Sequence, residues 1–319
     1  MRSRWLNRCC FSGPAGRPAA TRAARLRARV RRAVQPCAAL ACRPRAAMFA
    51  CSAMQGLSIA IITFNEERNL ADCIRSCQDL ADEVVVLDSF STDATERIAR
   101  EFAKVRFSQH HFDGHVQQKE RAFALCRNPW ILSLDADERL SPELAAELRA
   151  LDPGPRVGFR MPRVTFVMGR AIRHSGWYPQ RKYRLVRRGH ARWAGENPHD
   201  YLVVDGPGGD LRGDLFHYSF QDLSHMVRTA DSFSSIQAVN LRARGQRFPR
   251  LRAVLKPVVK FLEIYVWKRG FLDGFPGFVV AVQNAHSTFL REAKVHELSL
   301  GLVDRPSNLR PDPKVVARS

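Results

Sequence analysis

Residues 130–138 read WILSLDADE, an apolar run that ends in a cluster of acids. A short run of this kind, bounded by polar residues, is typical of a strand buried on both faces of a sheet. Asp135 and Asp137 are separated by one residue, so in an extended chain their side chains project to the same side. Two carboxylates at a strand end suit one hard divalent cation, which also binds diphosphate oxygens and neutralises a leaving nucleotide. Taken alone, Asp-x-Asp is equally compatible with a solvated turn.

The pattern of this stretch occurs twice more, earlier in the chain. Residues 57–62 (LSIAII) lead into TFNEE at 63–67, and residues 83–87 (EVVVL) end at Asp88. Periodic apolar residues predict a helix over 70–80, and a further helix is expected near 117–125. Two more helices are expected after Asp93 and after Ser141, with these residues as their N-caps. Strands that alternate with helices predict an α/β fold with a mostly parallel sheet covered on both faces. Ligands of such sheets bind beyond the carboxyl ends of the strands, where these acids lie.

The pattern changes after Pro153. Shorter alternating segments at 157–164 and 182–186 predict antiparallel strands appended to the sheet, and from about 221 to 295 the sequence is helical. We therefore expect a sheet domain over 56–220, a helical extension over 221–296 and a flexible tail over 297–319. Cys73 and Cys77, four residues apart on the first helix, are expected to be buried core residues.

The net charge of +20 is concentrated at the amino terminus. Residues 1–55 contain 12 Arg and no Lys, Asp or Glu, which leaves +8 for the rest. The favoured interpretation is a disordered basic tail, or a misassigned start with the true one at Met48 or Met54; a transit-type presequence comes second. A nucleic-acid arm comes last because the tail has few interleaved aromatics, so no nucleic-acid partner is expected.

No apolar stretch approaches the roughly 18–20 residues that span a bilayer, so no transmembrane anchor is expected. Only three cysteines lie outside the basic tail, without the spacing of a zinc site, which indicates a reducing, cytoplasmic setting. Residues 261–269 (FLEIYVWKR) mix large apolar residues with cations, as an interfacial helix on an anionic leaflet would. The alternative is a core helix, and residues 271–278 are expected to form a turn broken by Gly and Pro.

Several segments together resemble glycosyltransferase family 2. They are TFNEE (63–67), LDSFSTD (87–93), LDADE (134–138), QK (118–119), RLVRR (184–188), FHYS (216–219) and GFLDGFPG (270–277). The resemblance covers about residues 56–295, and the last segment is similar to the subgroup that adds β-1,4-linked glucose to heptose of the lipopolysaccharide core. Phe90 departs from the glycine that the wider family often has, which puts the geometry of its loop in doubt.

The resemblance implies a GT-A fold, a UDP-sugar donor, inversion at the anomeric carbon, and Mg²⁺ or Mn²⁺ as cofactor. Asp135 and Asp137 would handle the metal and the diphosphate, with His217 as a third metal ligand or simply a structural histidine. For Asp88 we favour a bond to base or ribose over a helix cap. The remaining donor-binding residues would be Thr63, Asn65, Glu67, Lys119 and Arg184, the last two steadying phosphates or acting as ordinary surface cations.

An inverting transfer needs a general base opposite the leaving group. Residues 195–200 (GENPHD) hold the candidates: by the resemblance we choose Asp200, with Glu196 as runner-up and a plain surface acid as the alternative. The expected function is transfer of a hexose, with glucose as the expected sugar, to an inner-core heptose of lipopolysaccharide at the cytoplasmic face of the inner membrane, as a peripheral protein. The alternatives are another polysaccharide, lipid or protein acceptor, and a non-enzymatic basic nucleotide- or nucleic-acid-binding protein.

Overall fold

A computed structural model describes residues 56–196, 199–245 and 250–301. The described residues all belong to one compact unit. The expectations for residues 1–55, and for the tail beyond 301, lie outside the described residues. The same holds for the side chains of Glu196 and His199, although their backbone is described.

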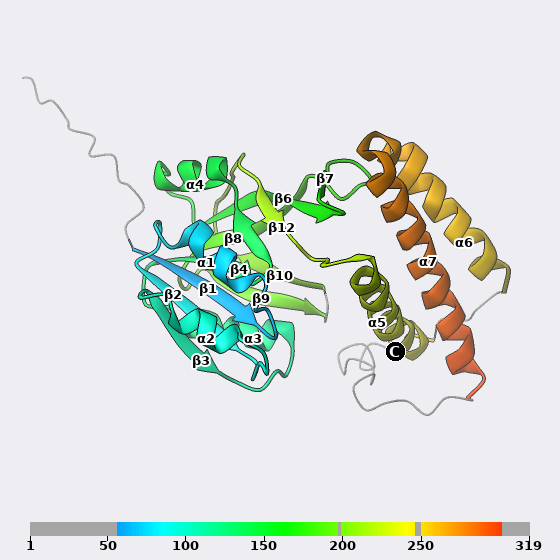
Figure 1. Cartoon of the computed structure of the whole chain (residues 1–319), viewed down its shortest axis with the longest axis horizontal. Helices are drawn as coiled ribbons and strands as arrows, with labels where there is room; N and C mark the ends of the chain where they lie inside the picture. Colours follow the sequence, from blue (N-terminus) through cyan, green and yellow to red (C-terminus); the bar gives the residue numbers. More distant parts are fainter. Residues whose placement is uncertain (1–55, 197–198, 246–249, 302–319) are drawn as a thin grey trace, which may run out of the picture. The chain divides into compact units, whose positions relative to one another are not determined.

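Four parallel strands form one half of the main sheet, in the order β3-β2-β1-β4 (Figure 1). Their bounds are β1 Leu57–Thr63, β2 Glu83–Asp88, β3 Val105–Gln109 and β4 Trp130–Asp135. The predicted parallel sheet is confirmed, with β1, β2 and β4 at the expected positions. Strand β3 was not predicted: it is the edge strand, and its residues are half-buried or exposed, so no buried apolar run marks it in the sequence.

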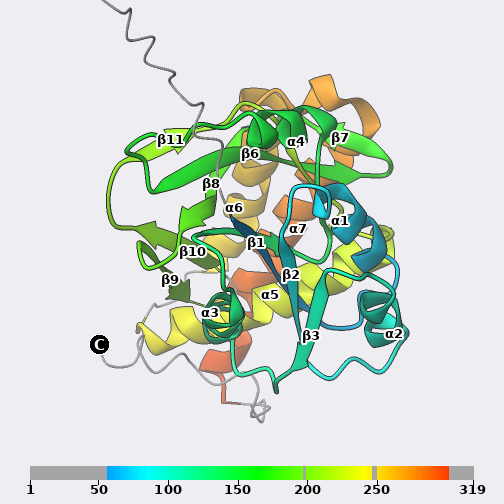
Figure 2. The same cartoon turned by 90° about the vertical axis from the view of Figure 1, so that its left-hand side faces the viewer.

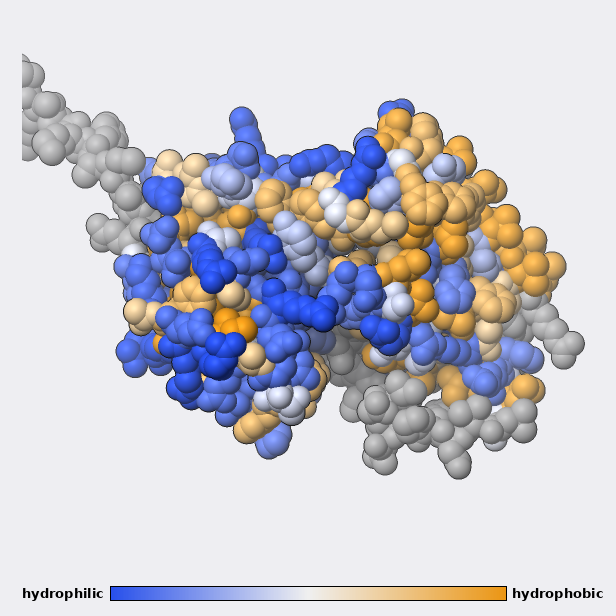
Figure 3. Space-filling view, viewed as in Figure 1, coloured by the Kyte–Doolittle hydropathy of each residue, from blue (hydrophilic) through white to orange (hydrophobic). Residues whose placement is uncertain are grey.

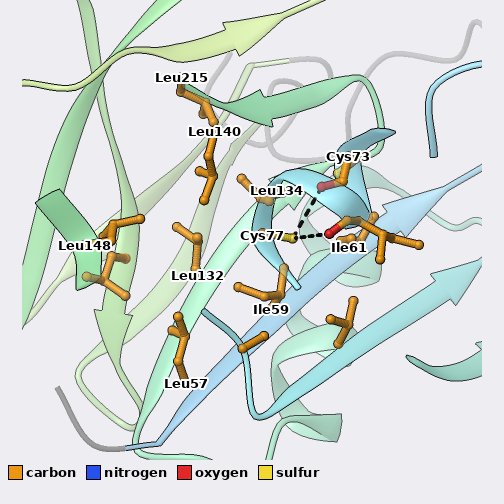
Figure 4. Packing of buried hydrophobic residues seen from close by; sticks show 14 of the residues in the cluster. Leu57, Ile59, Ile61, Cys73, Cys77, Leu132, Leu134, Leu140, Leu148 and Leu215 are labelled. Carbon is orange, nitrogen blue, oxygen red and sulfur yellow. Dashed lines mark hydrogen bonds between the residues drawn. The ribbon is translucent and has the colours of Figure 1, made fainter. Parts of the chain in front are cut away.

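Helices cover both faces of these strands (Figure 2). Helices α1 (Leu70–Cys77), α2 (Thr95–Arg100) and α4 (Pro142–Arg149) contribute to one apolar cluster, and α3 (His115–Leu125) to another. Cys73 and Cys77 are buried against Ile59 and Leu134, which confirms their expected place in the core (Figure 4). Ser141 caps α4 as predicted, its hydroxyl accepting from the N–H of Leu144.

The predicted cap of α2 is displaced. The helix begins at Thr95, and its cap position is Ala94, which has no side-chain oxygen. The Asp93 carboxylate instead accepts hydrogen bonds from the N–H groups of Thr95 and Glu67. Asp93 therefore ties the start of α2 to the loop after β1.

The other half of the sheet is mixed, and β4 joins it through the antiparallel strand β8. The strands are β5 Glu138–Leu140, β6 Gly158–Val167, β7 Arg170–Ile172, β8 Gln180–Arg187, β11 Gly208–Asp210 and β12 Leu215–His217. The predicted antiparallel pair is confirmed as β6 and β8. A separate antiparallel hairpin is formed by β9 Ala191–Glu196 and β10 His199–Val204.

The carboxyl-terminal part is helical, as predicted. It contains α5 Leu223–Ala243, α6 Arg250–Leu262, a π-helical turn η1 Glu263–Trp267, a 3₁₀ turn η2 Gly270–Asp273 and α7 Gly274–Ser299. The turn expected over 271–278 is shorter: α7 begins at Gly274, and Pro276 fits in its first turn, where a missing N–H costs nothing. No helix in the described part of the chain is both long and apolar enough to cross a bilayer.

Candidate active site

The carboxyl ends of β1, β2 and β4 meet at one edge of the sheet. Thr63 lies opposite Asp88 in the register of β1 with β2, and Ile62 lies opposite Asp135 in the register of β1 with β4. Beyond this edge is a cavity of about 730 Å³, a volume typical of sites for small ligands. Thr63, Asp135 and Asp137 line the cavity, so the structure brings these three predicted residues together.

Asp135 is held between two cations. One carboxylate oxygen lies 2.8 Å from Nζ of Lys119, and the other lies 2.8 Å from Nη2 of Arg184. Burial acts to raise the pKa of Asp135, but the charges of Lys119 and Arg184 outweigh it and hold the pKa well below its ordinary value. Asp135 is therefore ionised, and in this structure both of its oxygens face cationic side chains.

Glu138 completes this cluster, although no role was predicted for it from the sequence. Its side chain is fully buried, 2.5 Å from Nη2 of Arg184, and it accepts the N–H of Asp135 at 3.0 Å. The buried pair fixes both the Arg184 guanidinium and the backbone that carries Asp135. The presence of a third acid in LDADE was the only signal in the sequence, because the pairing with Arg184 joins residues 46 positions apart.

Asp137 lies beside His217. Nε2 of His217 is 3.2 Å from the Asp137 carboxylate, and the two meet because β12 pairs with β5, which follows Asp137 directly. Burial acts to raise the pKa of Asp137, but His217 lowers it overall. A carboxylate and an imidazole at this distance provide an oxygen and a nitrogen ligand for one divalent cation. Within the described residues, no three Asp, Glu, His or Cys side chains are gathered closely enough to hold a metal without further ligands.

The predicted nucleoside-binding residues divide into two groups. Thr63 faces the cavity, and its buried hydroxyl has no hydrogen-bond partner among the described residues. Asn65, Glu67 and Asp88 instead bind the loop after β2. Asn65 accepts from the N–H of Thr92, Glu67 from that of Ala94, and Asp88 from that of Ser91. In this structure these three side chains shape the loop rather than line the cavity.

Glu66 lines the cavity as well, although the sequence did not single it out from its neighbours. Burial, followed by the charges of Asp137, Asp93 and Asp135, raises its pKa to about 7, against the opposing hydrogen bond from Asn69. A carboxyl group that exchanges a proton near neutral pH is thus placed close to the acids at the end of β4.

Asp200 reaches the same cavity from the β9–β10 hairpin. Its carboxylate lies 2.8 Å from Nζ of Lys119, the same ammonium group that binds Asp135. Burial acts to raise the pKa of Asp200, but Lys119 lowers it overall. Lys119 is almost completely buried and lies 4.6 Å from the centre of the Trp193 ring. One fixed cation therefore joins the predicted base to the predicted diphosphate end of the site.

The family of the chain follows from its relatives. Residues 58–200 match the family described as glycosyl transferase family 2. Over 250 residues, the chain is 31% identical to the lipopolysaccharide core biosynthesis glycosyltransferase LpsC of Rhizobium meliloti, which covers 76% of this chain and 92% of that protein. The chain belongs to glycosyltransferase family 2. An uncharacterised glycosyltransferase of Rickettsia typhi is 35% identical over 263 residues, 77% of this chain and 89% of the relative.

The chain has a GT-A-like fold, with a curled, mostly parallel sheet, flanking helices and a helical carboxyl-terminal region. Among solved structures, Staphylococcus aureus TarS in complex with UDP-GlcNAc matches with a TM-score of 0.42 and 13% identity, over 78% of this chain and 93% of that chain. Glucosyl-3-phosphoglycerate synthase of Mycobacterium tuberculosis, in complex with Mn²⁺ and UDP-glucose, matches with a TM-score of 0.30 and 23% identity, over 36% and 45% of the two chains.

Proposed function

We propose that this glycosyltransferase moves a hexose, with glucose as the expected sugar, from a UDP-sugar to a heptose of the lipopolysaccharide core, with inversion at the anomeric carbon. One observation carries the proposal: Asp135, Asp137 and Asp200 line a single cavity, with Lys119 between the first and the last. The site could thus hold a diphosphate near Asp135 and Asp137, with the ionised carboxylate of Asp200 next to it. The named role of LpsC supports the choice of the lipopolysaccharide core as acceptor.

The cation of the donor complex would be Mg²⁺ or Mn²⁺. Asp137 and His217 would hold it, with Asp135 beside them, and oxygens of the diphosphate would complete its coordination. When bound, the cation neutralises the charge that develops on the leaving nucleotide. Arg184 lies at the same end of the cavity and would add positive charge there.

Asp200 would act as the general base. Its carboxylate would accept the proton of the acceptor hydroxyl while that oxygen forms the new bond to the anomeric carbon. The bond between the anomeric carbon and the diphosphate breaks at the same time, and the nucleoside diphosphate leaves. Lys119 keeps Asp200 ionised and fixes its position before the acceptor binds.

Purified protein tests the proposal directly. With UDP-glucose, Mg²⁺ and heptose-terminated core oligosaccharide, it should release UDP and form a β-linked product, and excess EDTA should stop both. Turnover only with another donor sugar would overturn the assignment of glucose. Turnover only with an acceptor that lacks heptose would overturn the core assignment.

The helical extension supports attachment to a membrane surface. Along α6, apolar side chains recur every three or four residues, and each is more than half exposed: Leu251, Val254, Leu255, Val258, Val259 and Leu262. The charged side of α6 faces inward instead, where Lys256 lies 2.8 Å from Glu292 of α7. Figure 3 shows apolar surface gathered over α6 and α7. This is the reverse of a helix that packs its apolar face on a core.

We propose that this face of α6 enters the headgroup region of an anionic leaflet, which would also carry a lipid-linked acceptor. Trp267, 87% exposed, lies at the end of the face next to the exposed cations Lys268 and Arg269. Aromatic and basic side chains in this arrangement are typical of interfacial helices, which gain both apolar burial and attraction to acidic lipids.

The variant V258E/L262E should bind vesicles of phosphatidylglycerol and phosphatidylethanolamine about 10²-fold more weakly than the wild type, measured by co-sedimentation. Each change removes an apolar side chain whose burial is worth about 1.5–3 kcal/mol and adds a like charge. The matched control A103E/A150E adds the same charge at exposed positions on the sheet domain and should bind as the wild type does. Unchanged vesicle binding by V258E/L262E would exclude this face as the membrane contact.

A further inference from the structure

The cavity has a second group of cations that the proposed chemistry does not use. Strands β6 and β8 place Arg163, Arg181 and Lys182 on its lining, in addition to Lys119 and Arg184. We call these three residues the cationic wall. Lys182 and Arg184 are two residues apart on β8, so they project to the same side of the strand.

In the described part of the chain no carboxylate pairs with Arg181 or Lys182, and the carboxylate beside Arg163 is shared with Arg184. Lys182 has no hydrogen bond or ion pair there, and Arg181 donates to the backbone carbonyl of Leu211 at 2.7 Å. Arg163 lies 3.5 Å from an oxygen of Glu138 that is already 2.5 Å from Arg184. Nε of Arg163 is also buried without a partner among the described residues.

Arg160 lines the same cavity, but its positive charge is balanced by a carboxylate. Its guanidinium makes two hydrogen bonds to Asp210, at 2.8 and 2.9 Å. The other cations on the lining, Lys119 and Arg184, are likewise paired with carboxylates. The excess of positive charge is therefore confined to the cationic wall.

Burial and the neighbouring positive charges both act on Lys182. Burial, together with the charges of Arg163 and Arg184, lowers the pKa of Lys182 to about 8. A bound anion would relieve this repulsion and fill the donor capacity that Arg163 and Lys182 have to spare. Arginine guanidinium groups beside a lysine ammonium group are suited to binding an anionic group.

The position of the wall indicates which substrate carries the anion. Lys182 lies within electrostatic reach of Asp200, the proposed base that receives the proton of the acceptor. The donor diphosphate is assigned to Asp135 and Asp137, and neither Arg181 nor Lys182 forms an ion pair with either of them. We propose that Arg163, Arg181 and Lys182 bind a phosphate or carboxylate group carried by the acceptor glycan. This inference rests on the proposed function and specifies its acceptor as anionic.

The test is a calorimetric titration of the full chain, saturated with UDP, with core oligosaccharide in three forms: untreated, phosphatase-treated and carboxyl-reduced. The wild type should bind the untreated form at least about 10-fold more tightly than one of the two treated forms, because that treatment removes charge-assisted hydrogen bonds to the wall. Weaker binding after phosphatase treatment would identify the bound group as a phosphate, and weaker binding after carboxyl reduction would identify it as a carboxylate. The variant R181Q/K182Q should lose this preference and still bind UDP as the wild type does.

The control R160Q lines the same cavity but removes a cation that Asp210 already balances, so it should keep the preference. Equal binding of all three forms by the wild type would overturn the inference. A loss of UDP affinity in R181Q/K182Q, with the preference intact, would assign the wall to the donor diphosphate instead. UDP release is measured separately: a wild type that shows the preference but never releases UDP would sink the proposed function and leave the anion site standing.

Discussion

Asp137→Asn should lower the rate of sugar transfer by about 10³-fold. A divalent cation contributes several kcal/mol of transition-state stabilisation, and every 1.36 kcal/mol corresponds to a factor of ten. Asparagine keeps the size of the side chain and can still meet His217, but it removes the charge that would attract the cation. Asp137 is a cleaner target than Asp135, whose loss would leave Lys119 and Arg184 each without one carboxylate partner in a buried setting.

The measurement is UDP release as a function of Mn²⁺ concentration, with circular dichroism to verify the fold. The variant should need far more Mn²⁺ than the wild type to reach its reduced maximum. Asp79→Asn, the same charge change at an exposed position outside the cavity, serves as the control and should behave as the wild type. If Asp137→Asn turned over at the normal rate, or if EDTA left the wild type active, the metal assignment would be wrong.

The sequence predicted the parallel half of the sheet well because its strands are buried on both faces. Strands β1, β2 and β4 are near-continuous apolar runs, which have few other interpretations. The edge strand β3 is half exposed and reads VRFSQ, without a run or a clean period. The three-residue strands β5, β7, β11 and β12 are too short to show any period, and their pairing depends on partners far along the chain.

The candidate site likewise has some features that follow from the order of strands and others that depend on contacts between distant parts of the chain. Asp135 and Asp137 were found because parallel strands end at a common edge, a rule that needs only the order of strands. Thr63 was predicted from the resemblance to glycosyltransferase family 2. The meeting of His217 with Asp137 depends on the pairing of β12 with β5, and Lys119 reaches both Asp135 and Asp200 only in three dimensions. No spacing in the sequence encodes these contacts.

Two residues illustrate what sequence patterns leave out. Glu138 follows Asp135 by three positions, and its buried pair with Arg184 is set by how β4, β5 and β8 come together. Lys182 looks like any other lysine in a strand. Its importance comes from what surrounds it: the charges of two arginines act on it, and no carboxylate among the described residues lies within ion-pair distance.

Asp200→Asn should lower kcat by about 10²–10⁴-fold, the usual contribution of a general base. Asparagine cannot accept the proton of the acceptor hydroxyl, yet it keeps the shape of the side chain at the end of the β9–β10 hairpin. Lys119 retains its other partner, Asp135, so the donor end of the site should stay intact. Steady-state kinetics should therefore show a fall in kcat, and calorimetry should show unchanged affinity for UDP.

The control is Asp205→Asn, which changes an exposed acid just after β10 and should leave kcat unaltered. Glu196, whose side chain lies outside the described residues, provides the rival assignment. If Asp200→Asn kept its rate while Glu196→Gln lost it, the role of base would move to Glu196. A parallel loss of UDP affinity in Asp200→Asn would instead mean that Asp200 acts through Lys119 on the donor, because the ammonium group that it shares with Asp135 would have shifted.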